Sequence, residues 1–537
     1  MDTSCTCPFT HVGSAVLFAS VAVPLICAAL LYLGSVPKMV AKVMAAIGFT
    51  VPLVLALYLC TQFADAVKIS GYAFYSDASL GLPAAGISLK LGLNGIALPL
   101  FAMAAIVSFA AGIYAIAGNQ DRQQLYLALL LTMAGGVLGL FASIDIFFFY
   151  FFHELALIPT FIMIGIWGGT ARRVAAIEMT IYLTLGAMLV LAGLVALYVG
   201  SGIATFDFIT LRDYLAANPL SLVTQKWVYG LLLIGFGVLV SLFPFHTWAP
   251  RGYANAPASA AMLHAGVLKK FGLYGLIQIA APLLPDGVGQ WTNLLVVLAL
   301  GNILVIGFIT MAQKDLRYML GYSSVMHMGY AFLGIATMGV LGLSGAVIMM
   351  FAHGLTIAAL FLMADCVEKR AGTTEMASFG GMAHETPVLA ALFSAAIFAS
   401  VGLPGFANFW GELSIFTAVF NMNHLVGALA VLGIIISAIY GLRASAALFF
   451  GSRSAAYEKR IAANGKPADL TFAEKLPILV LLGALMFVGF WPRSISDSIN
   501  AEMSAKYPAA PVQQVVPSAA ASLSQDGDVA LSGERKF

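Results

Sequence analysis

The stretch GLPGFANFWGE, from Gly402 to Glu412, interrupts a long apolar run and decides how the surrounding helix is interpreted. Its two glycines and its proline predict a break in that helix, because proline cannot donate a backbone hydrogen bond and glycine adopts turn conformations readily. Glu412 follows the break within the same apolar segment. A carboxylate at membrane depth is energetically costly, so its presence indicates a functional role.

A second proline-interrupted segment, FPFHTWAP, lies at residues 243–250. Paired broken helices at corresponding places in two halves of a chain are typical of an ion pathway. We therefore expect broken helices at positions seven and twelve, within two inverted five-helix repeats. These repeats are expected at residues 124–283 and 284–450, and the matched breaks are the observation on which they depend.

The composition identifies the class of protein. The chain has 537 residues, 61% hydrophobic and only 9% charged, and its mean hydropathy is +0.95. Soluble proteins carry roughly 25% charged residues. Because a spanning helix needs about 20 mostly apolar residues, we expect an all-α polytopic membrane protein of about fourteen transmembrane helices. These helices are expected near residues 13–34, 40–62, 94–117, 124–142, 145–168, 175–199, 227–248, 255–283, 290–312, 317–338, 341–366, 386–419, 424–450 and 474–494.

The flanking regions differ in composition from the repeats. Residues 1–123 are expected to hold three helices and a strand-like or loop layer at 62–90 on the outer face. Residues 451–494 are expected to form an amphipathic inner segment followed by the last helix. The Ala-, Ser- and Pro-rich residues 495–537 are interpreted as a disordered outer tail. Basic residues gather in alternate loops, which places both termini on the outer side of a bacterial inner membrane.

Ionisable residues in the predicted helices are the candidates for chemistry. The strongest are Glu154, Lys270, His327, His353 and Glu412, with Lys269, Glu178 and His264 as further candidates. A neutral imidazole can accept a proton on one nitrogen and donate from the other, so carboxylates, lysines and histidines at membrane depth predict a proton relay. The structural alternatives are a protonated, hydrogen-bonded carboxyl at Glu154 and hydrogen-bonded histidines within the core.

The adjacent lysines are expected to have different roles. Neighbouring helical residues point about 100° apart, so only one of Lys269 and Lys270 can face a given partner. We assign the pathway role to Lys270. The alternative for Lys269 is a side chain that extends to the membrane surface.

Several strings then point to a known family. FFHELALIPTFIMIGIWGG, PFHTWAPRGYANAP, KDLRYMLGYSSVMHMGYAFLGI, FAHGLTIAALF and ASVGLPGFANFWGE resemble the subunit M family of proton-pumping NADH–quinone oxidoreductase, respiratory complex I. The wider family of antiporter-like subunits includes multi-subunit cation/proton antiporters and membrane-bound hydrogenases. The resemblance covers about residues 90–450. It implies fourteen helices, the inverted repeats, and a proton-translocating subunit whose key positions are Glu154, Lys270, His327, His353 and Glu412.

The chain departs from this family at four positions. The family's usual lysine on the seventh helix is replaced by Leu239, and Glu178 stands where the sixth helix often has a lysine. Lys269 replaces an apolar residue, and Asn94 replaces a common aspartate. Glu154 therefore lacks its usual partner. We predict that Lys269 compensates for the lysine missing at Leu239.

The sequence shows no redox site of its own. It contains no glycine-rich dinucleotide turn after a strand and no CxxC set, so NADH, FMN, iron–sulfur clusters and quinone are expected in partner subunits. The expected partners are antiporter-like membrane subunits and the lipid bilayer, with no nucleic acid. The alternative functions are a subunit of a cation/proton antiporter or hydrogenase, and an electron carrier that binds haem through His327 and His353.

Overall fold

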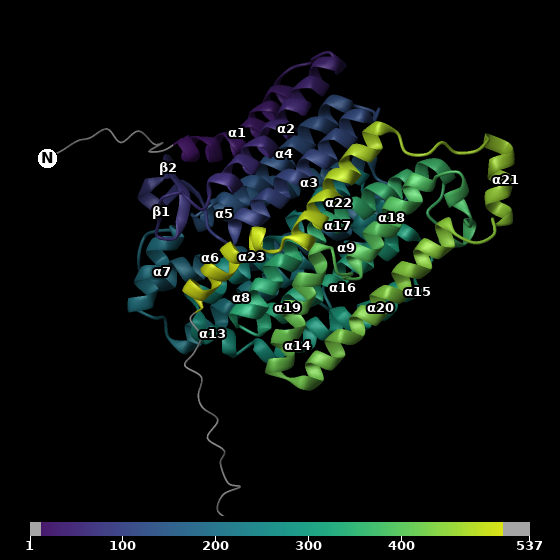
Figure 1. Cartoon of the computed structure of the whole chain (residues 1–537). Helices are drawn as coiled ribbons and strands as arrows, with labels where there is room; N and C mark the ends of the chain where they lie inside the picture. Colours follow the sequence, from purple (N-terminus) through teal and green to yellow (C-terminus); the bar gives the residue numbers. More distant parts are fainter. Residues whose placement is uncertain (1–11, 508–537) are drawn as a thin grey trace, which may run out of the picture.

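Long helices dominate the computed structural model, which describes residues 12–507 (Figure 1). Within these residues, eleven helices are long and apolar enough to cross a membrane. They are α1 (Val12–Leu33), α2 (Lys38–Gln62), α3 (Ala97–Ala117), α4 (Gln123–Ala142), α5 (Ile146–Trp167), α6 (Arg172–Ser201), α8 (Leu222–Val240), the composite helix Thr292–Ala312, α17 (Val340–Ala371), α20 (His424–Phe449) and α22 (Phe472–Phe490). The expected helical membrane fold is confirmed, whereas the count of fourteen spans and the inverted repeats stay predictions.

The break after Gly402 is confirmed. Helix α18 (Pro387–Ser400) ends just before it, and α19 (Ala407–Met422) begins just after it. Gly402 and Gly405 have φ angles of 81° and 103°, a region that residues with a side chain rarely adopt. The sequence therefore ends the helix at the position where the glycines and the proline predicted it.

The earlier break is confirmed as well, and one asparagine holds it. Helix α8 ends at Val240, and α9 (Trp248–Asn255) begins after an irregular turn. Asn302 accepts a hydrogen bond from the Phe243 backbone N–H at 2.6 Å and donates to the Ser241 and Val325 carbonyls at 3.1 and 2.8 Å. Buried backbone groups need such partners, so Asn302 stabilises the interrupted backbone.

The expected continuous helix at 255–283 is wrong. The segment is divided into α10 (Ala258–Gly266), a 3-10 turn, α11 (Phe271–Gly275), a π-helical turn and α12 (Ala281–Leu283). A Cβ at Gly266 would lie 2.9 Å from the Gly354 carbonyl oxygen of α17, so the two backbones pack closely here. The 3-10 turn contains Lys269 and Lys270, and such irregular turns often mark functional positions.

A small antiparallel sheet lies at one end of the bundle. Strands β1 (Lys68–Ile69), β2 (Tyr72–Leu82) and β3 (Ile87–Leu93) pair in the order β1-β2-β3, with Ala73 opposite Leu93 and Leu82 opposite Ile87. The strand-like layer expected at 62–90 is thus confirmed. Figure 1 shows α7 (Phe208–Ala217) and α23 (Arg493–Lys506) toward this end, which we call the sheet side. The opposite end, the α21 side, carries α21 (Ala455–Asn464), the short helix expected in the charged segment.

The disordered tail expected from residue 495 is wrong for its first part. Residues 493–506 form α23, which is held by three long-range hydrogen bonds. Asn94 donates to Glu502 at 3.2 Å, Lys506 donates to Gln278 at 2.6 Å, and the Tyr507 hydroxyl donates to the Ile277 carbonyl at 2.7 Å. These polar contacts offset the low hydrophobicity of the segment. The remaining residues, 508–537, lie outside the described part of the chain.

Helix α17 occupies the middle of the bundle. It packs against α3, α10, α16 (Leu316–Ala336), α19 and α22. The apolar part of α17 is buried throughout, unlike α1 and α6, which expose one face. His353 lies in this central helix, so any network that includes it is enclosed by protein on all sides.

Candidate functional site

Lys270 and His353 form the centre of a buried polar row. The Lys270 Nζ donates to the Ala265 carbonyl at 2.5 Å and lies 3.0 Å from Nδ1 of His353. Because a lysine ammonium can only donate, His353 accepts through Nδ1 and carries its own proton on Nε2. That Nε2 is buried and has no hydrogen-bond partner within residues 12–507. The expected burial of Lys270 is confirmed, since its exposed fraction is 0%.

His327 continues the row beyond His353. The two ring centroids lie 5.8 Å apart. Nδ1 of His327 is 2.8 Å from the Ser323 carbonyl oxygen, and Nε2 is 3.0 Å from the Ser400 carbonyl oxygen. Carbonyl oxygens only accept hydrogen bonds, so both contacts are satisfied when the ring carries a proton on each nitrogen. Both ring nitrogens of His327 thus face acceptors that can take part in proton transfer.

Glu412 stands at the far end of this row. Ser400, which accepts from His327, is the last residue of α18, and Glu412 lies in α19 across the break. Glu412 is only 4% exposed, as expected. A Cβ built on Gly402 would collide with Oε2 of Glu412, so the glycine allows the carboxyl group to lie directly against the interrupted backbone.

Lys269 and His264 form a second polar group near Tyr253. The Lys269 Nζ donates to Ser324 at 3.3 Å and lies 5.5 Å from the centroid of the Tyr253 ring. The hydroxyl of Tyr253 is 3.1 Å from Nδ1 of His264. Lys269 is 1% exposed, so the alternative of a lysine extending to the surface is wrong. The two adjacent lysines contact different partners, as the helical geometry predicted.

Glu154 lies at the flank of these groups rather than within them. Its side chain is 29% exposed, and its Oε1 is 3.2 Å from Nδ1 of His153. His153 is buried and stacks on Phe271 with the ring centroids 3.8 Å apart. Within residues 12–507 the ion-pair partner of Glu154 is this histidine. Lys269 donates to Ser324 and forms no ion pair with Glu154 within residues 12–507, so its compensation for the lysine missing at Leu239 stays a prediction.

Glu178 is held apart from the row. The Arg251 guanidinium lies 2.5 Å from Oε2 of Glu178, and the Thr247 hydroxyl donates to Oε1 at 3.0 Å. These bonds join α6 to the segment that follows the first break. Glu178 thus links α6 to α9. Within residues 12–507 it makes no hydrogen bond to Lys270 or His353.

A polar cavity of about 370 Å³ opens on the α21 side. It is lined by the ends of α3, α5 and α17 and by the start of α10. Arg317 and Lys369 form ion pairs with Asp365 in its wall, at 2.7 and 2.9 Å. Ser259 lines the cavity on α10, and Lys269 lies ten residues further along the same segment. At a rise of about 1.5 Å per residue, roughly 15 Å separates the two.

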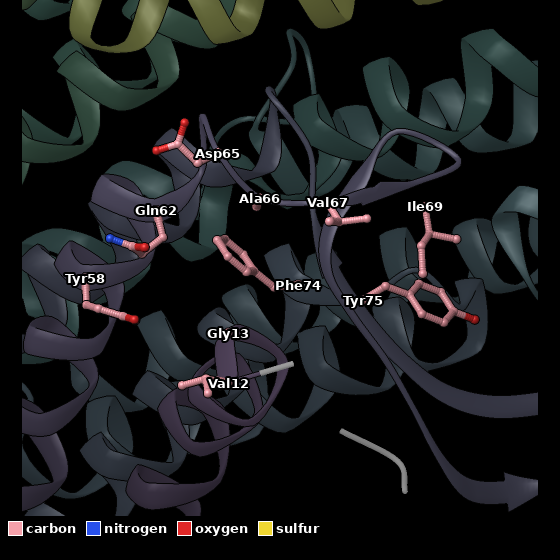
Figure 2. A pocket seen from close by; sticks show the side chains of 10 residues that line it. All are labelled: Val12, Gly13, Tyr58, Gln62, Asp65, Ala66, Val67, Ile69, Phe74 and Tyr75. Atoms are coloured by element: carbon pink, nitrogen blue, oxygen red, sulfur yellow. The ribbon is translucent and has the colours of Figure 1, made fainter. Parts of the chain in front are cut away.

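A separate cavity of about 290 Å³ lies on the sheet side (Figure 2). It is bordered by the ends of α1 and α2 and by β2, and its polar residues include Gln62, Asp65 and Tyr75. The candidate site residues do not line it. Within the described residues, no group of three or more His, Cys, Asp or Glu side chains could hold a metal ion.

Some of the residues that shape this site were not predicted. Asn302, Ser324 and Ser400 contribute a side-chain amide, a hydroxyl and a backbone carbonyl. Such groups are common in membrane helices, so no pattern in the sequence distinguishes them. His153 is recognisable in the sequence only as a weaker candidate, because it stands beside the stronger Glu154 in an otherwise aromatic run.

Comparison with known proteins gives consistent results. Residues 143–437 match the family model described as NADH:quinone oxidoreductase/Mrp antiporter, TM. The chain is 34% identical to NAD(P)H-quinone oxidoreductase chain 4 1 of Picosynechococcus sp., covering 83% of each protein. It is 31% identical to NADH-quinone oxidoreductase subunit M of Rickettsia prowazekii, covering 76% of this chain and 82% of the relative.

Solved structures show the same relationship. A chain of respiratory complex I from Thermus thermophilus with bound NADH is 31% identical, with a TM-score of 0.81, covering 92% of this chain and 99% of that one. A chain of the Mrp complex from Dietzia sp. has a TM-score of 0.79 at 20% identity, covering 93% of this chain and 98% of that one. At that identity the second match establishes a shared fold.

Proposed function

Since this chain belongs to the family of NADH:quinone oxidoreductase and Mrp antiporter transmembrane subunits, we propose that it translocates protons as a subunit M-like part of a redox-driven NADH–quinone oxidoreductase. The observation that carries this proposal is the enclosed row of Lys270, His353, His327 and Glu412, which ends beside the break between α18 and α19. Ionisable groups inside a membrane protein are retained where protons or ions are moved.

The row supports stepwise proton transfer. Lys270 donates toward Nδ1 of His353, and the Nε2 proton of His353 has no partner within residues 12–507. When His353 takes a proton from Lys270 on Nδ1, it becomes able to release the Nε2 proton toward His327. His327 lies between two carbonyl oxygens, which can accept hydrogen bonds from its ring nitrogens while a proton passes. Glu412 then receives a proton beside the break, and water between the rings completes each step.

The α21-side cavity supports an entry route. The basic residues of the chain gather at this end, which favours its placement on the inner side of the membrane. Helix α10 begins in the wall of the cavity and leads to His264 and Lys269. Roughly 15 Å is half the thickness of the hydrocarbon core, so the lysines lie near mid-depth. The sheet side would then face outward, with both termini on the outer side of a bacterial inner membrane.

Electron transfer is assigned to partner subunits. The curated relatives are named as subunits of quinone oxidoreductases, and the solved relatives are chains of larger complexes. We propose that NADH, FMN, iron–sulfur clusters and quinone bind in those partners. This chain would contribute proton transfer without a redox centre of its own. Its exposed apolar helix faces, such as that of α6, suit contact with lipid or with neighbouring membrane subunits.

The decisive experiment measures proton translocation by the purified complex in sealed vesicles. NADH and a short-chain quinone drive the reaction, and a pH-sensitive dye reports proton movement. Lys270→Met is expected to abolish proton transfer through this subunit, because Met keeps the volume and removes the charge. Lys466→Met, at an exposed position, is the control and should resemble the wild type. Equal translocation by both variants would contradict the proposal.

The same vesicles test the antiporter alternative, since the family description names Mrp antiporters beside NADH:quinone oxidoreductase. An imposed Na⁺ gradient, without NADH, would drive proton movement through a secondary antiporter. Proton movement that depends on the Na⁺ gradient, together with no response to NADH oxidation, would replace the redox-driven function with the antiporter function.

A further inference from the structure

One buried histidine is not used by the row described above. His153 is 2% exposed and lies next to Glu154 in α5. Consecutive helical residues point about 100° apart, so the two side chains face different surroundings. Glu154 is partly exposed at the flank of the bundle, whereas His153 is enclosed. The pair therefore joins an accessible carboxylate to the protein interior.

The interior contacts of His153 lead toward the buried lysines. Its ring stacks on Phe271 at 3.8 Å with an angle of 19° between the planes. Phe271 directly follows Lys270 in the chain. His264, Lys269 and Lys270 all precede Phe271 in the segment that begins with α10. The stacking on Phe271 packs the ring against the segment of the buried lysines, while its Nδ1 contacts Glu154 at 3.2 Å.

Neither buried lysine can serve Glu154 directly. Lys270 is bonded to the Ala265 carbonyl and to His353, and Lys269 is bonded to Ser324. Glu154 has an ion-pair contact with His153 at 3.2 Å. Among the buried groups, His153 is thus the one that has an ion-pair contact with Glu154 within residues 12–507.

We propose that His153 is a proton-relay residue that connects Glu154 to the buried cluster of His264 and Lys270. A proton from the interior binds to Nε2 of the neutral ring, and the ring releases its Nδ1 proton to the carboxylate of Glu154. The imidazole is left neutral with one proton on Nε2, and Glu154 becomes a neutral carboxylic acid. The reverse step returns the proton to the interior. This inference rests on the proposed function, because His153 would connect Glu154 to the same proton pathway.

The test uses His153→Gln in the complete complex, reconstituted in sealed vesicles with NADH and a short-chain quinone. Gln keeps hydrogen-bonding groups at this position but cannot carry a proton between two nitrogens. The expected result is a fall of about 100-fold in proton transfer through this subunit, the lower end of what a positioned acid–base group contributes. His424→Gln, at the exposed start of α20, is the matched control and should resemble the wild type.

A second variant separates proton relay from structural support. His153→Ala removes the ring, and imidazole added to the buffer is expected to restore proton transfer in assembled complexes. If proton transfer falls in His153→Gln but imidazole restores nothing in His153→Ala, the histidine is structural and the inference is overturned. If His153→Ala does not assemble, His153→Gln decides, and wild-type proton transfer in that variant overturns the inference.

The proposed function fails separately from this inference. A wild-type complex that oxidises NADH without moving protons contradicts the proposed function, whatever the variants do. A wild-type complex that moves protons, with His153→Gln moving them equally well, contradicts only the role of His153.

Discussion

Replacement of Asn302 by Leu is expected to destabilise the protein strongly. Leu has a similar volume, so the change removes hydrogen bonds without leaving a large cavity. It leaves the Phe243 N–H and the Ser241 carbonyl without their side-chain partner, while the Val325 carbonyl keeps its helical bond. A buried polar group without a partner costs about 1–3 kcal/mol, so two such groups reduce the free energy of unfolding by about 2–6 kcal/mol.

The free energy of unfolding can be measured for the full chain by SDS titration in mixed micelles, followed by tryptophan fluorescence. The matched control is Asn293→Leu, at an exposed position of the same composite helix. Surface substitutions of this kind change the free energy of unfolding by about 0.5 kcal/mol or less. If Asn302→Leu is as stable as Asn293→Leu, then Asn302 does not hold the break, and the backbone groups must have other partners.

Three further outcomes are expected. Gly402→Ala should lower proton translocation, because the added Cβ collides with Glu412. The control is Gly451→Ala, which has a φ of 80° and open space around it; it should lose only about 1–2 kcal/mol of stability to backbone strain and keep its proton translocation. Lys269→Met should assemble and should lower proton translocation less than Lys270→Met does, because Lys269 contacts Ser324 rather than His353; an equal loss in the two variants would contradict separate roles for the two lysines. Burial lowers the pKa of Lys506 to about 8, so the unfolded state binds more protons between pH 8 and 10.5 and the docking of α23 strengthens as the pH rises through that range. Lys506→Met should remove this dependence, and proteolytic release of α23 that is equally pH-dependent in both proteins would contradict it.

The features predicted correctly are those with local causes. Proline and glycine limit the backbone wherever they stand, so both breaks could be placed from the sequence. The interruption at Lys269 and Lys270 has a tertiary cause, the close approach of Gly266 to α17, and no local pattern indicates it. The partner of Glu154 was missed for a related reason. Lys269 was favoured because it is an unusual additional cation, whereas the adjacent His153 makes the contact.

The burial of ionisable residues was predictable, but their pairing was not. Adjacent helical residues point in different directions, so different partners for the two lysines were predictable, but the contact of Lys269 with Ser324 was not. Which of the two faces His353 depends on the irregular turn that carries both of them. For the C-terminal segment, the sequence analysis predicted too little structure. Its composition is typical of disorder, yet α23 is ordered because Glu502, Lys506 and Tyr507 find buried partners on distant helices.

The position of α23 also determines how late in synthesis the packing on the sheet side can be completed. Asn94 belongs to the first fifth of the polypeptide, but the carboxylate that it contacts, Glu502, emerges from the ribosome some 400 residues later. Gln278, from the middle of the chain, likewise accepts a hydrogen bond from Lys506, which is synthesised more than 200 residues later. Before that point Asn94 can donate to Gln278, at 3.2 Å, and Gln278 can donate to the Tyr72 hydroxyl, at 2.6 Å, so only the contacts with Glu502 and Lys506 form when translation is nearly finished. A chain that is truncated before residue 493 would lack α23, and with it the contacts of Glu502 and Lys506 on the sheet side.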